Sequence, residues 1–509
     1  MTAATSPSET KNHSRSHRMY LATLAAGLTT TASSVIYAYN GAQTLIEPFI
    51  VSSYEQRAGH PLSPLGLSFI WGSMAAMSPV GAVLGSASLN HLADTYGRRF
   101  TGLFLIPLVI LCGCIAAFLA RPLGLFELLY VGRLLVGFSQ GLGALIPIYM
   151  TECALNSHRG RIGGLSTFCR FAWDPLALLL AQSWALGTAE LWPFLVTYAA
   201  IPALLTLIIV SQVLPESPKH LFITLGNQKA AEDALRFYHG PNVDTEAKWA
   251  EYRREMEQAQ IHQRNSKRNG KKKHGEGEEE DEGATPLGFR DIFATPHLRR
   301  SFLVCAMTIV SVTIVGESLA SQYSTVIFEA AGLGHRNAVF CSLLAVIPGI
   351  VAMLLATTFV DQLGRRPLVL GAMLVGVVAN LCLASSVGRL PWLAVAGIIL
   401  IKVSHDGGAG PVAHMMPGEV CPQGIRAKSA TVGWSLHHVI EVLVTLCFPV
   451  SFDLIGPWTF AIFATSSAFF FVWLFVYLPE TKQKSVDRIV DEWIRLVGDE
   501  KMEQSGNYS

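Results

Sequence analysis

The chain has 509 residues, of which 51% are hydrophobic and only 15% are charged, and its formal net charge is +1 at pH 7. Soluble domains usually carry about 25% charged residues, so this composition excludes an ordinary soluble protein. The basic residues are scattered and balanced by acidic ones, which excludes nucleic acid as a partner. We therefore expect a helical membrane protein, because long apolar runs take precedence over any count of soluble domains.

Residues 1–19 are polar and rich in Ser, Thr and His, which predicts a disordered N-terminal tail. The apolar stretch that follows is too long for the core of a signal peptide and predicts a first membrane span. A bilayer core of about 30 Å requires about 20 apolar residues of helix, and twelve runs meet this requirement. They lie near 20–42, 66–90, 101–120, 127–150, 162–185, 191–214, 301–325, 337–360, 367–388, 391–416, 429–452 and 455–478.

The short connections between these spans differ in their content of Lys and Arg. The connections after spans 2, 4, 8 and 10 each contain two such residues, for example Arg98 and Arg99, whereas the opposite connections are poorer in them. Because Lys and Arg accumulate in cytoplasmic loops, we expect both termini and the long middle loop to be cytoplasmic. The plasma membrane is the expected location.

The predicted spans form an N-terminal six-helix bundle over 20–214 and a C-terminal six-helix bundle over 301–478. The loop between them, 215–300, begins with a helix-favouring stretch at 227–238. A basic block followed by an acidic block then predicts a charged, disordered insert over 262–285. In the C-terminal tail, 479–509, apolar residues share one face of 485–496, which predicts a short amphipathic helix.

Charged motifs of the first half recur in the second half at nearly one offset. The matched elements are Asp94-x-x-Gly97-Arg98-Arg99 with Asp361-x-x-Gly364-Arg365-Arg366, Glu152 and Arg159 with Glu419 and Arg426, and Pro215-Glu216 with Pro479-Glu480. Such a repeat indicates two homologous bundles, an arrangement that places a binding site between the halves near the bilayer midplane.

The repeated charges all lie at the predicted cytoplasmic ends of spans, where a carboxylate can pair with an arginine of the neighbouring connection. Pairs that form and break as the bundles rock would act as a gate. The alternative is that the charges only establish topology. Topology would require neither the acidic residues nor their matched spacing, so the pattern favours the gate.

Several longer motifs carry a family resemblance. They are DTYGRRF at 94–100, GRLLVGFSQGLGALIPIYMTE at 132–152, HRGR at 158–161, PESPK at 215–219, DQLGRRPL at 361–368, GAGPVAHMMPGEVCPQGIR at 408–426 and PETK at 479–482. The chain resembles the sugar porter branch of the major facilitator superfamily, which includes the facilitative glucose and fructose transporters. The resemblance implies an all-α membrane protein with twelve transmembrane helices in two pseudo-symmetric six-helix bundles. It also implies alternating access and hexoses or related polyols as the usual cargo.

The resemblance assigns roles to particular residues of this chain. The family's cytoplasmic charge network falls on Asp94, Arg98, Arg99, Arg133, Glu152, Arg159, Glu216, Asp361, Arg365, Arg366, Glu419, Arg426 and Glu480. Its sugar pocket matches poorly, because most of the usual contact residues are replaced. The candidate substrate-binding residues are Asn40, Thr167, Ser318, Gln322, Tyr323, His414, His437 and His438.

Ionisable residues within spans are costly, by about 2.5–3.5 kcal/mol each, and mark functional sites by default. His437 and Glu441 are four residues apart, which permits proton coupling. Arg170 and Asp174 have the same spacing, and mutual neutralisation is the simpler interpretation for them. Against coupling, proton-linked members of the family carry Asp where this chain has Asn40, which cannot ionise.

The sequence thus favours a facilitative carrier of a hexose or a related sugar. The alternatives are a proton-linked or organic-anion or polyol carrier and, with less support, a non-transporting nutrient sensor. No nucleophile triad, phosphate loop or metal-ligand cluster is apparent, so we expect neither an enzyme nor a cofactor or metal site. Gly81-x-x-x-Gly85 and Gly137-x-x-x-Gly141 are better explained by close helix packing. The expected partners are a small solute and the lipid bilayer, and the oligomeric state is not indicated.

Overall fold

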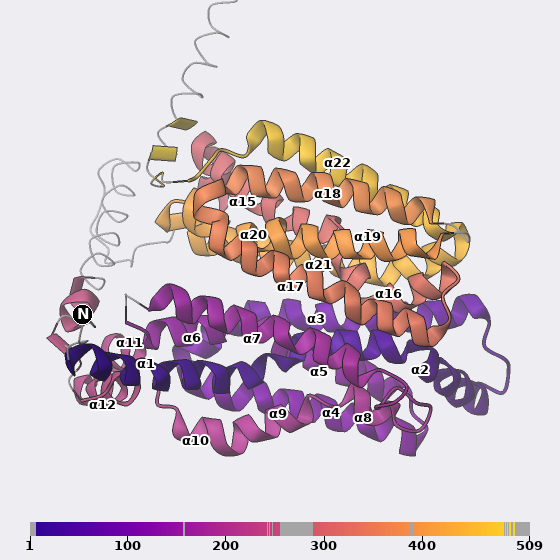
Figure 1. The fold of residues 1–509 in the computed structure, drawn as a ribbon, viewed down its shortest axis with the longest axis horizontal. Helices are drawn as coiled ribbons and strands as arrows, with labels where there is room; N and C mark the ends of the chain where they lie inside the picture. Colours follow the sequence, from indigo (N-terminus) through magenta and orange to yellow (C-terminus); the bar gives the residue numbers. More distant parts are fainter. Residues whose placement is uncertain are drawn as a thin grey trace, which may run out of the picture.

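The computed structural model describes residues 7–155, 158–241, 243, 245–246, 248–254, 289–386, 390–482, 484, 486, 488–489 and 492–493. The predicted charged insert, 262–285, lies outside the described residues. Every regular element among the described residues is a helix, and the helices run roughly side by side along the long axis of the molecule (Figure 1).

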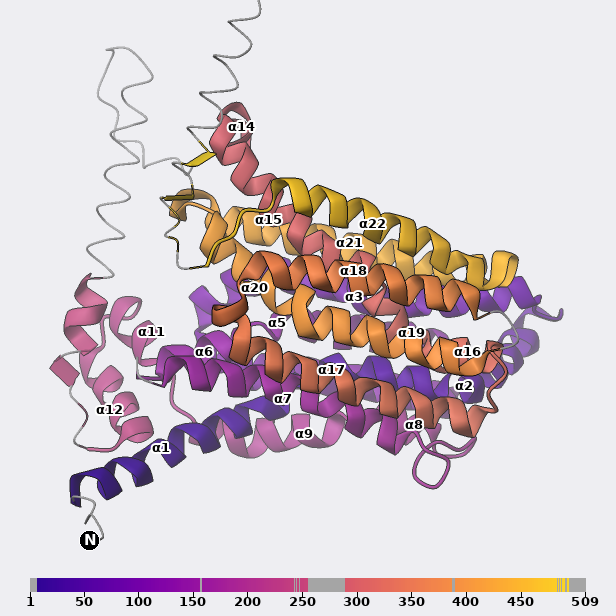
Figure 2. The ribbon, with the colours of Figure 1, turned by 45° about the horizontal axis from the view of Figure 1, so that its top comes forward.

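The helices form two groups, one from each half of the chain, which lie against each other in Figures 1 and 2. The first group contains α1 Pro7–Ala26, η1 Gly27–Ser34, α2 Val35–Ala58, α3 Pro64–Tyr96, η2 Phe100–Leu105, α4 Ile106–Leu123, α5 Glu127–Leu142, α6 Leu145–Cys153, α7 Arg159–Leu180, α8 Trp192–Val196, α9 Ala200–Leu205, η3 Thr206–Val210 and α10 Ser211–Val213. The second group contains α15 Pro296–Ile314, α16 Glu317–Ala330, α17 His335–Leu363, α18 Arg365–Ser385, α19 Pro391–Ser404, η4 His405–Ala409, α20 Gly410–Val420, α21 Gln423–Ile455, η5 Gly456–Trp458 and α22 Thr459–Tyr477. Between the groups lie α11 Pro218–Ile223, α12 Gln228–His239 and α14 Phe289–Ala294.

Nine stretches of the described residues are long and apolar enough to cross a membrane. One of them, Lys428–Tyr477, holds two successive helices, because the chain turns between α21 and α22 at Gly456. The two remaining spans are α7, which carries the charged residues Arg170 and Asp174, and the helix of span 6, whose apolar part at Ala200–Val213 is shorter. The prediction of twelve membrane helices in two six-helix bundles is confirmed.

The N-terminal tail differs from its prediction. We expected disorder over 1–19, but α1 begins at Pro7 and continues through Ala26 into the first span. Proline is well tolerated at the first helical position, and no later residue interrupts the helix before Gly27. The expectation of disorder is therefore wrong for 7–19, while residues 1–6 lie outside the described chain.

Helices α3 and α5 pack so closely that only glycine fits at their contact. A Cβ atom added to Gly81 would lie 2.2 Å from the carbonyl oxygen of Leu134, and one added to Gly137 would lie 2.0 Å from that of Ser78. Both distances are far below an ordinary carbon–oxygen contact. The two Gly-x-x-x-Gly segments therefore let these helices approach backbone to backbone, as the sequence suggested.

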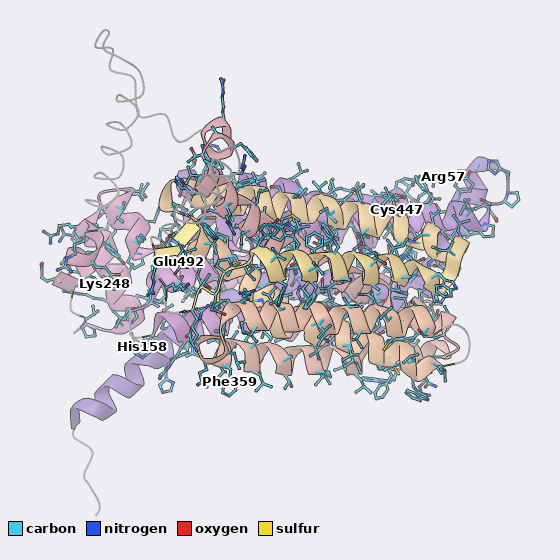
Figure 3. All side chains as sticks on the ribbon, turned by 90° about the horizontal axis from the view of Figure 1, so that it is seen from above. Arg57, His158, Lys248, Phe359, Cys447 and Glu492 are labelled. Atoms are coloured by element: carbon cyan, nitrogen blue, oxygen red, sulfur yellow. The ribbon has the colours of Figure 1, made fainter. Side chains whose placement is uncertain are left out.

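The repeated arginines define one end of the molecule. We call the end that carries Arg98, Arg99, Arg365 and Arg366 the arginine end. Helices α11 and α12 and the N-terminus lie there in Figures 1 and 2. Seen from above, His158 and Lys248 lie toward this end, and Arg57 lies at the opposite one (Figure 3).

The C-terminal tail also packs at the arginine end. Ile489 and Trp493 are buried, and the guanidinium of Arg300 lies over the Trp493 ring at 5.9 Å from its centroid. The described residues among 486–493 are helical, and neighbouring positions of the predicted amphipathic helix lie outside the described residues.

Candidate functional site

In the first half, Glu216 binds the start of the span that follows the arginine doublet. Its carboxylate accepts hydrogen bonds from the backbone amides of Arg98 and Arg99 at 3.0 Å each. These amides have no partner within their own helix, and a negative charge is favourable at a helix N-terminus. Gly97 makes this approach possible, because its φ of +92° suits glycine and an added Cβ would lie 2.3 Å from Glu216 Oε2.

The arginine side chains extend the same network. Arg98 lies 3.1 Å from Asp94 Oδ1 through Nη1 and 3.4 Å from Glu152 Oε2 through Nε. The Ser217 hydroxyl donates to Glu152 at 2.6 Å, while the Arg99 guanidinium donates to the carbonyl of Ser211 at 2.7 Å. Four segments of the first half are therefore joined by charge-assisted hydrogen bonds.

The second half repeats this arrangement. Glu480 accepts from the backbone amides of Arg365 and Arg366 at 3.1 and 3.2 Å, and Gly364 has a φ of +93°. Arg365 pairs with Glu419 at 2.9 Å and with Asp361 at 2.9 Å. The hydroxyl of Thr481 donates to Glu419, as Ser217 donates to Glu152 in the first half.

Three other predicted members of the charge network fare differently. The side chain of Arg159 lies outside the described residues. Arg426 is partly buried beside Cys421, at the arginine end. Arg133, however, lies seven residues into α5 from the opposite end and donates to Gln322 Oε1 at 2.9 Å. The prediction that Arg133 joins the arginine-end network is wrong, because α5 runs toward that end and Arg133 is near its start.

A buried charged cluster lies at the centre, where the two bundles meet. The ammonium of Lys402 lies 2.8 Å from Glu317 Oε1 and donates to the Ser321 hydroxyl at 2.8 Å. It also contacts the hydroxyl of Tyr37, which comes from the other bundle and bonds Ser321 at 2.9 Å. Lys402 is only 3% exposed, and the ion pair with Glu317 offsets much of the cost of burying its charge.

Two predicted substrate-binding residues, Asn40 and Gln322, form contacts between the bundles, and a third, Tyr323, joins two helices of the second bundle. The Asn40 amide donates to Ser324 at 2.7 Å and accepts from the backbone amide of Thr325 at 3.1 Å. Gln322 accepts from Arg133 and donates to the Thr445 hydroxyl at 3.2 Å. Tyr323 is buried and donates to the carbonyl of Thr445 at 3.0 Å. In this conformation these groups join helices to one another.

The histidines of α21 form a separate cluster. His438 Nδ1 lies 3.0 Å from Glu441 Oε2, and His437 Nδ1 lies 2.5 Å from the hydroxyl of Thr313. His438 is therefore the direct partner of Glu441, whereas His437 interacts with Glu441 only electrostatically, and the coupling of His437 with Glu441 stays a prediction. Helical spacing permits either pairing, and the contact with Thr313 on α15 turns His437 aside.

The remaining candidates, His414, Thr167 and Ser318, lie on α20, α7 and α16. His414 is exposed, stacks on Trp434 with ring centroids 4.4 Å apart, and is close enough to Arg170 of the other bundle to interact electrostatically. Thr167, one turn before Arg170, is partly buried. Ser318 is buried at the start of α16, just after the helix break at Gly316, where φ is +97°.

The pairing considered for Arg170 and Asp174 is not formed. No ion pair within 4.0 Å joins them among the residues that the structure describes, and the Arg170 guanidinium lies over the Phe171 ring. Asp174 is buried and interacts electrostatically with Lys402. Arg170 also interacts electrostatically with Asp174, without direct contact, so Lys402 and Arg170 together stabilise this carboxylate.

Sequence reasoning missed the hydroxyl groups that complete the centre. Ser324 and Thr445 each contact a candidate site residue, and Ser321 contacts Lys402, yet none of the three was predicted. A usable signal existed in the run Ser321 to Thr325, which is unusually polar for a membrane helix. Thr445 follows Glu441 by one helical turn, so it shares the face of the charged residues.

The fold and the mirrored charge network define a transporter of the major facilitator type, and the comparisons with known proteins agree. A family model described as Sugar (and other) transporter matches residues 21–493. The chain therefore belongs to the sugar transporter family, as the resemblance predicted. The structure of the inward open xylose transporter XylE from E. coli matches with a TM-score of 0.71 and 19% identity, covering 93% of this chain and 99% of that one. At this identity the likeness shows the fold.

Among curated relatives, solute carrier family 2, facilitated glucose transporter member 5 from Pongo abelii is 28% identical over 488 residues, which cover 91% of this chain and 90% of the relative. The Homo sapiens protein of the same name is 27% identical with the same coverage. Facilitated glucose transporter protein 1 from Caenorhabditis elegans is 26% identical over 469 residues, which cover 88% of this chain and 85% of the relative. All three relatives are transporters.

Proposed function

We propose that the chain carries a hexose or a closely related sugar across the membrane by facilitated, alternating access. Family membership supports a sugar as the cargo, and the relatives that the chain resembles along most of its length are named facilitated glucose transporters. The proposal requires two bundles that can rock about a central site and separate at one end at a time.

The observation that carries the proposal is the uneven distribution of bonds between the bundles. Hydrogen bonds that cross between them run from the centre to the end opposite the arginines, from Tyr37–Ser321 and Asn40–Ser324 to Thr44–His335 and Ser68–Asp453. At the arginine end, every described ion pair joins residues of one bundle. The bundles are thus latched on one side of the centre, which is the pattern of a carrier with its pathway opening toward the arginine end.

We infer that the arginine end faces the cytoplasm, because Lys and Arg accumulate in short cytoplasmic loops. The termini, the loop with α11 and α12, and the tail helix would then all be cytoplasmic, most simply at the plasma membrane. The charge network would act as the gate: Arg98 and Arg365 exchange partners with residues of the other bundle when that end closes.

The sugar would bind between the bundles near Thr167, His414 and the central polar groups. A dry site must replace each hydrogen bond that a sugar hydroxyl makes with water, so amide, hydroxyl and imidazole groups are required. Asn40, Gln322 and Tyr323 would contact the sugar only as the latched contacts rearrange. Ser318, His437 and His438 are the further candidate contacts that the second bundle would provide.

Proton linkage has less support. Asn40 cannot ionise, and its side chain is used in hydrogen bonds to Ser324 and Thr325. The direct partner of Glu441 is His438, so the pair proposed for proton transfer is not in direct contact. The curated relatives named above are facilitated transporters.

Uptake into proteoliposomes tests the proposal. The purified chain should take up a labelled hexose, the uptake should be competed by unlabelled hexose, and a pH gradient should not change the final level. Labelled polyols and organic acids run in parallel provide the comparison. Accumulation above equilibrium under an acid-outside gradient would contradict facilitated movement, and no uptake of any solute would support the sensor alternative.

A further inference from the structure

Three potential metal ligands meet on helix α21. His437, His438 and Glu441 each offer a ligand atom, and these atoms all lie within 4.8 Å of one another. His438 Nδ1 and Glu441 Oε2 are already 3.0 Å apart. In a tetrahedral zinc site with bonds of about 2.0–2.2 Å, neighbouring ligand atoms lie about 3.3 Å apart. Small rotations of side chains on one rigid helix would therefore bring all three to bonding distance.

We propose that His437, His438 and Glu441 form a binding site for a divalent transition-metal ion, with Zn²⁺ as the best match. Two imidazole nitrogens and one carboxylate oxygen suit Zn²⁺, whereas Ca²⁺ and Mg²⁺ require oxygen ligands. Three protein ligands leave a fourth position of a tetrahedral ion open to water or to a solute hydroxyl. We expected no metal site from the sequence, because adjacent histidines on a helix do not by themselves indicate that their side chains converge.

Neighbouring residues orient these ligands. The hydroxyl of Thr313, on α15, holds His437 through Nδ1 at 2.5 Å. Hydrogen bonds of this outer kind are typical of metal-binding imidazoles and position the ring before the ion arrives. On the other side of His437, the Trp434 ring lies edge-on with centroids 5.2 Å apart. His437 is thus held by one contact to α15 and one contact within its own helix.

The cluster lies close to a contact between the bundles, because Thr445, one turn after Glu441, bonds Gln322, which accepts from Arg133 of the first bundle. It lies on α21 between Trp434, which stacks on His414, and Thr445, which bonds Gln322. The side chains of His438 and Glu441 keep 16% and 12% of their surface exposed, so an ion can reach them. An ion bound there would add positive charge beside the route proposed for the solute, so we expect zinc to inhibit uptake. This expected inhibition rests on the proposed function, whereas zinc binding itself does not.

Binding is tested on the purified full-length protein in detergent, so the result does not depend on transport. ZnCl₂ should raise the melting temperature in a saturable way, CoCl₂ should give visible absorption bands of a low-coordinate ion, and CaCl₂ should do neither. His437→Gln, His438→Gln and Glu441→Gln should each abolish the saturable shift. A matched control is His335→Gln with Glu329→Gln, which removes a His–Glu contact of 2.6 Å that lacks a third described ligand; it should bind zinc as the wild type does.

Thr313→Val keeps all three ligands and guards against variants that fail to fold. It should weaken zinc binding about 10- to 100-fold, as loss of an outer hydrogen bond does at other metal sites. Metal-free melting temperatures show which variants are folded. Equal zinc shifts in the wild type and the three ligand variants would overturn the proposal, as would no shift in the wild type or an equal shift with calcium. Loss of zinc inhibition of uptake in Thr313→Val would link the site to transport.

Discussion

Glu216 in the first half and Glu480 in the second each accept hydrogen bonds from the two backbone amides that begin the following span. Beside them, Ser217 and Thr481 donate to matching carboxylates at Glu152 and Glu419. At the centre this correspondence ends. The second bundle contributes the buried Lys402 and the partly buried Glu317 and α21 histidines, while the first bundle contributes mainly the buried Tyr37, Asn40, Arg133 and Asp174.

The difference separates two kinds of task. At the arginine end, carboxylates bind backbone amides beside a glycine turn. These backbone groups are the same in both halves, so the same types of side chain occur in both. The central faces bind each other and the solute, and neither partner is symmetric. Asymmetry at the centre is therefore expected of a carrier built from repeated halves, and variants at the two regions should behave differently.

The largest effect is expected at the centre, from Lys402→Met. Removing the ammonium leaves Glu317, which is partly buried, without its ion pair, which should cost up to about 3–5 kcal/mol. The double variant Lys402→Met with Glu317→Gln removes both charges and should recover much of the loss. Melting temperature and monodispersity in detergent measure this. A double variant no more stable than Lys402→Met alone would show that the ion pair is not what stabilises the centre.

The next effect tests the symmetry of the arginine ends. Glu216→Gln and Glu480→Gln each weaken three backbone hydrogen bonds, because Ser217 and Lys482 also donate to these carboxylates. Hydrogen bonds to charged groups are worth about 1.5–3 kcal/mol, so each variant should lose that order of stability, and the two losses should be similar. Unfolding measurements on both variants, each compared with the wild type, test whether the two losses of stability are similar. If one variant lost much stability and the other lost none, the two carboxylates would contribute unequally to stability although their contacts are alike.

The glycine turns should show a smaller effect with a small asymmetry. Gly97→Ala and Gly364→Ala force a side chain into positive φ, which costs about 1–3 kcal/mol. An added Cβ would lie 2.3 Å from the Glu216 carboxylate and 2.7 Å from that of Glu480, so the first variant should be the worse. Adding Glu216→Ala to Gly97→Ala should cost less than the sum of the two changes. Strict additivity would remove the steric part of the explanation.

The smallest effect is expected where the halves differ at the arginine end. Arg98 Nη1 lies 2.9 Å from His220 Nδ1, and no such contact is described for Arg365. His220→Ala should therefore lower stability by about 0.5–1.5 kcal/mol and leave the Glu216 interactions in place. The loss of stability caused by His220→Ala is measured both in the wild type and in the Glu216→Gln variant. Full loss of the Glu216 effect in the His220→Ala background would show that the two act as one unit.

Particular residues mark the limit of prediction for the site. Arg98, Glu216 and their counterparts are recognisable because identical spacing in two halves implies identical placement. Arg133 was misplaced, since a charge at the start of a span says nothing of which neighbour it meets. The pairing of Lys402 with Glu317, residues far apart in the chain, follows from how α16 and α19 cross, and no spacing rule encodes that crossing.

The sequence by itself determined the membrane setting, the number of spans, the duplication and the charged turns at one end. These features depend on local properties, namely the length of apolar runs, the positions of glycines and the spacing of nearby charges. Such properties do not depend on which helices pack together. Only the tertiary structure decided which polar groups meet at the centre, including the partner of each histidine on α21. Those contacts join helices distant in the chain, and a rotation of one helix by a single residue would exchange every partner.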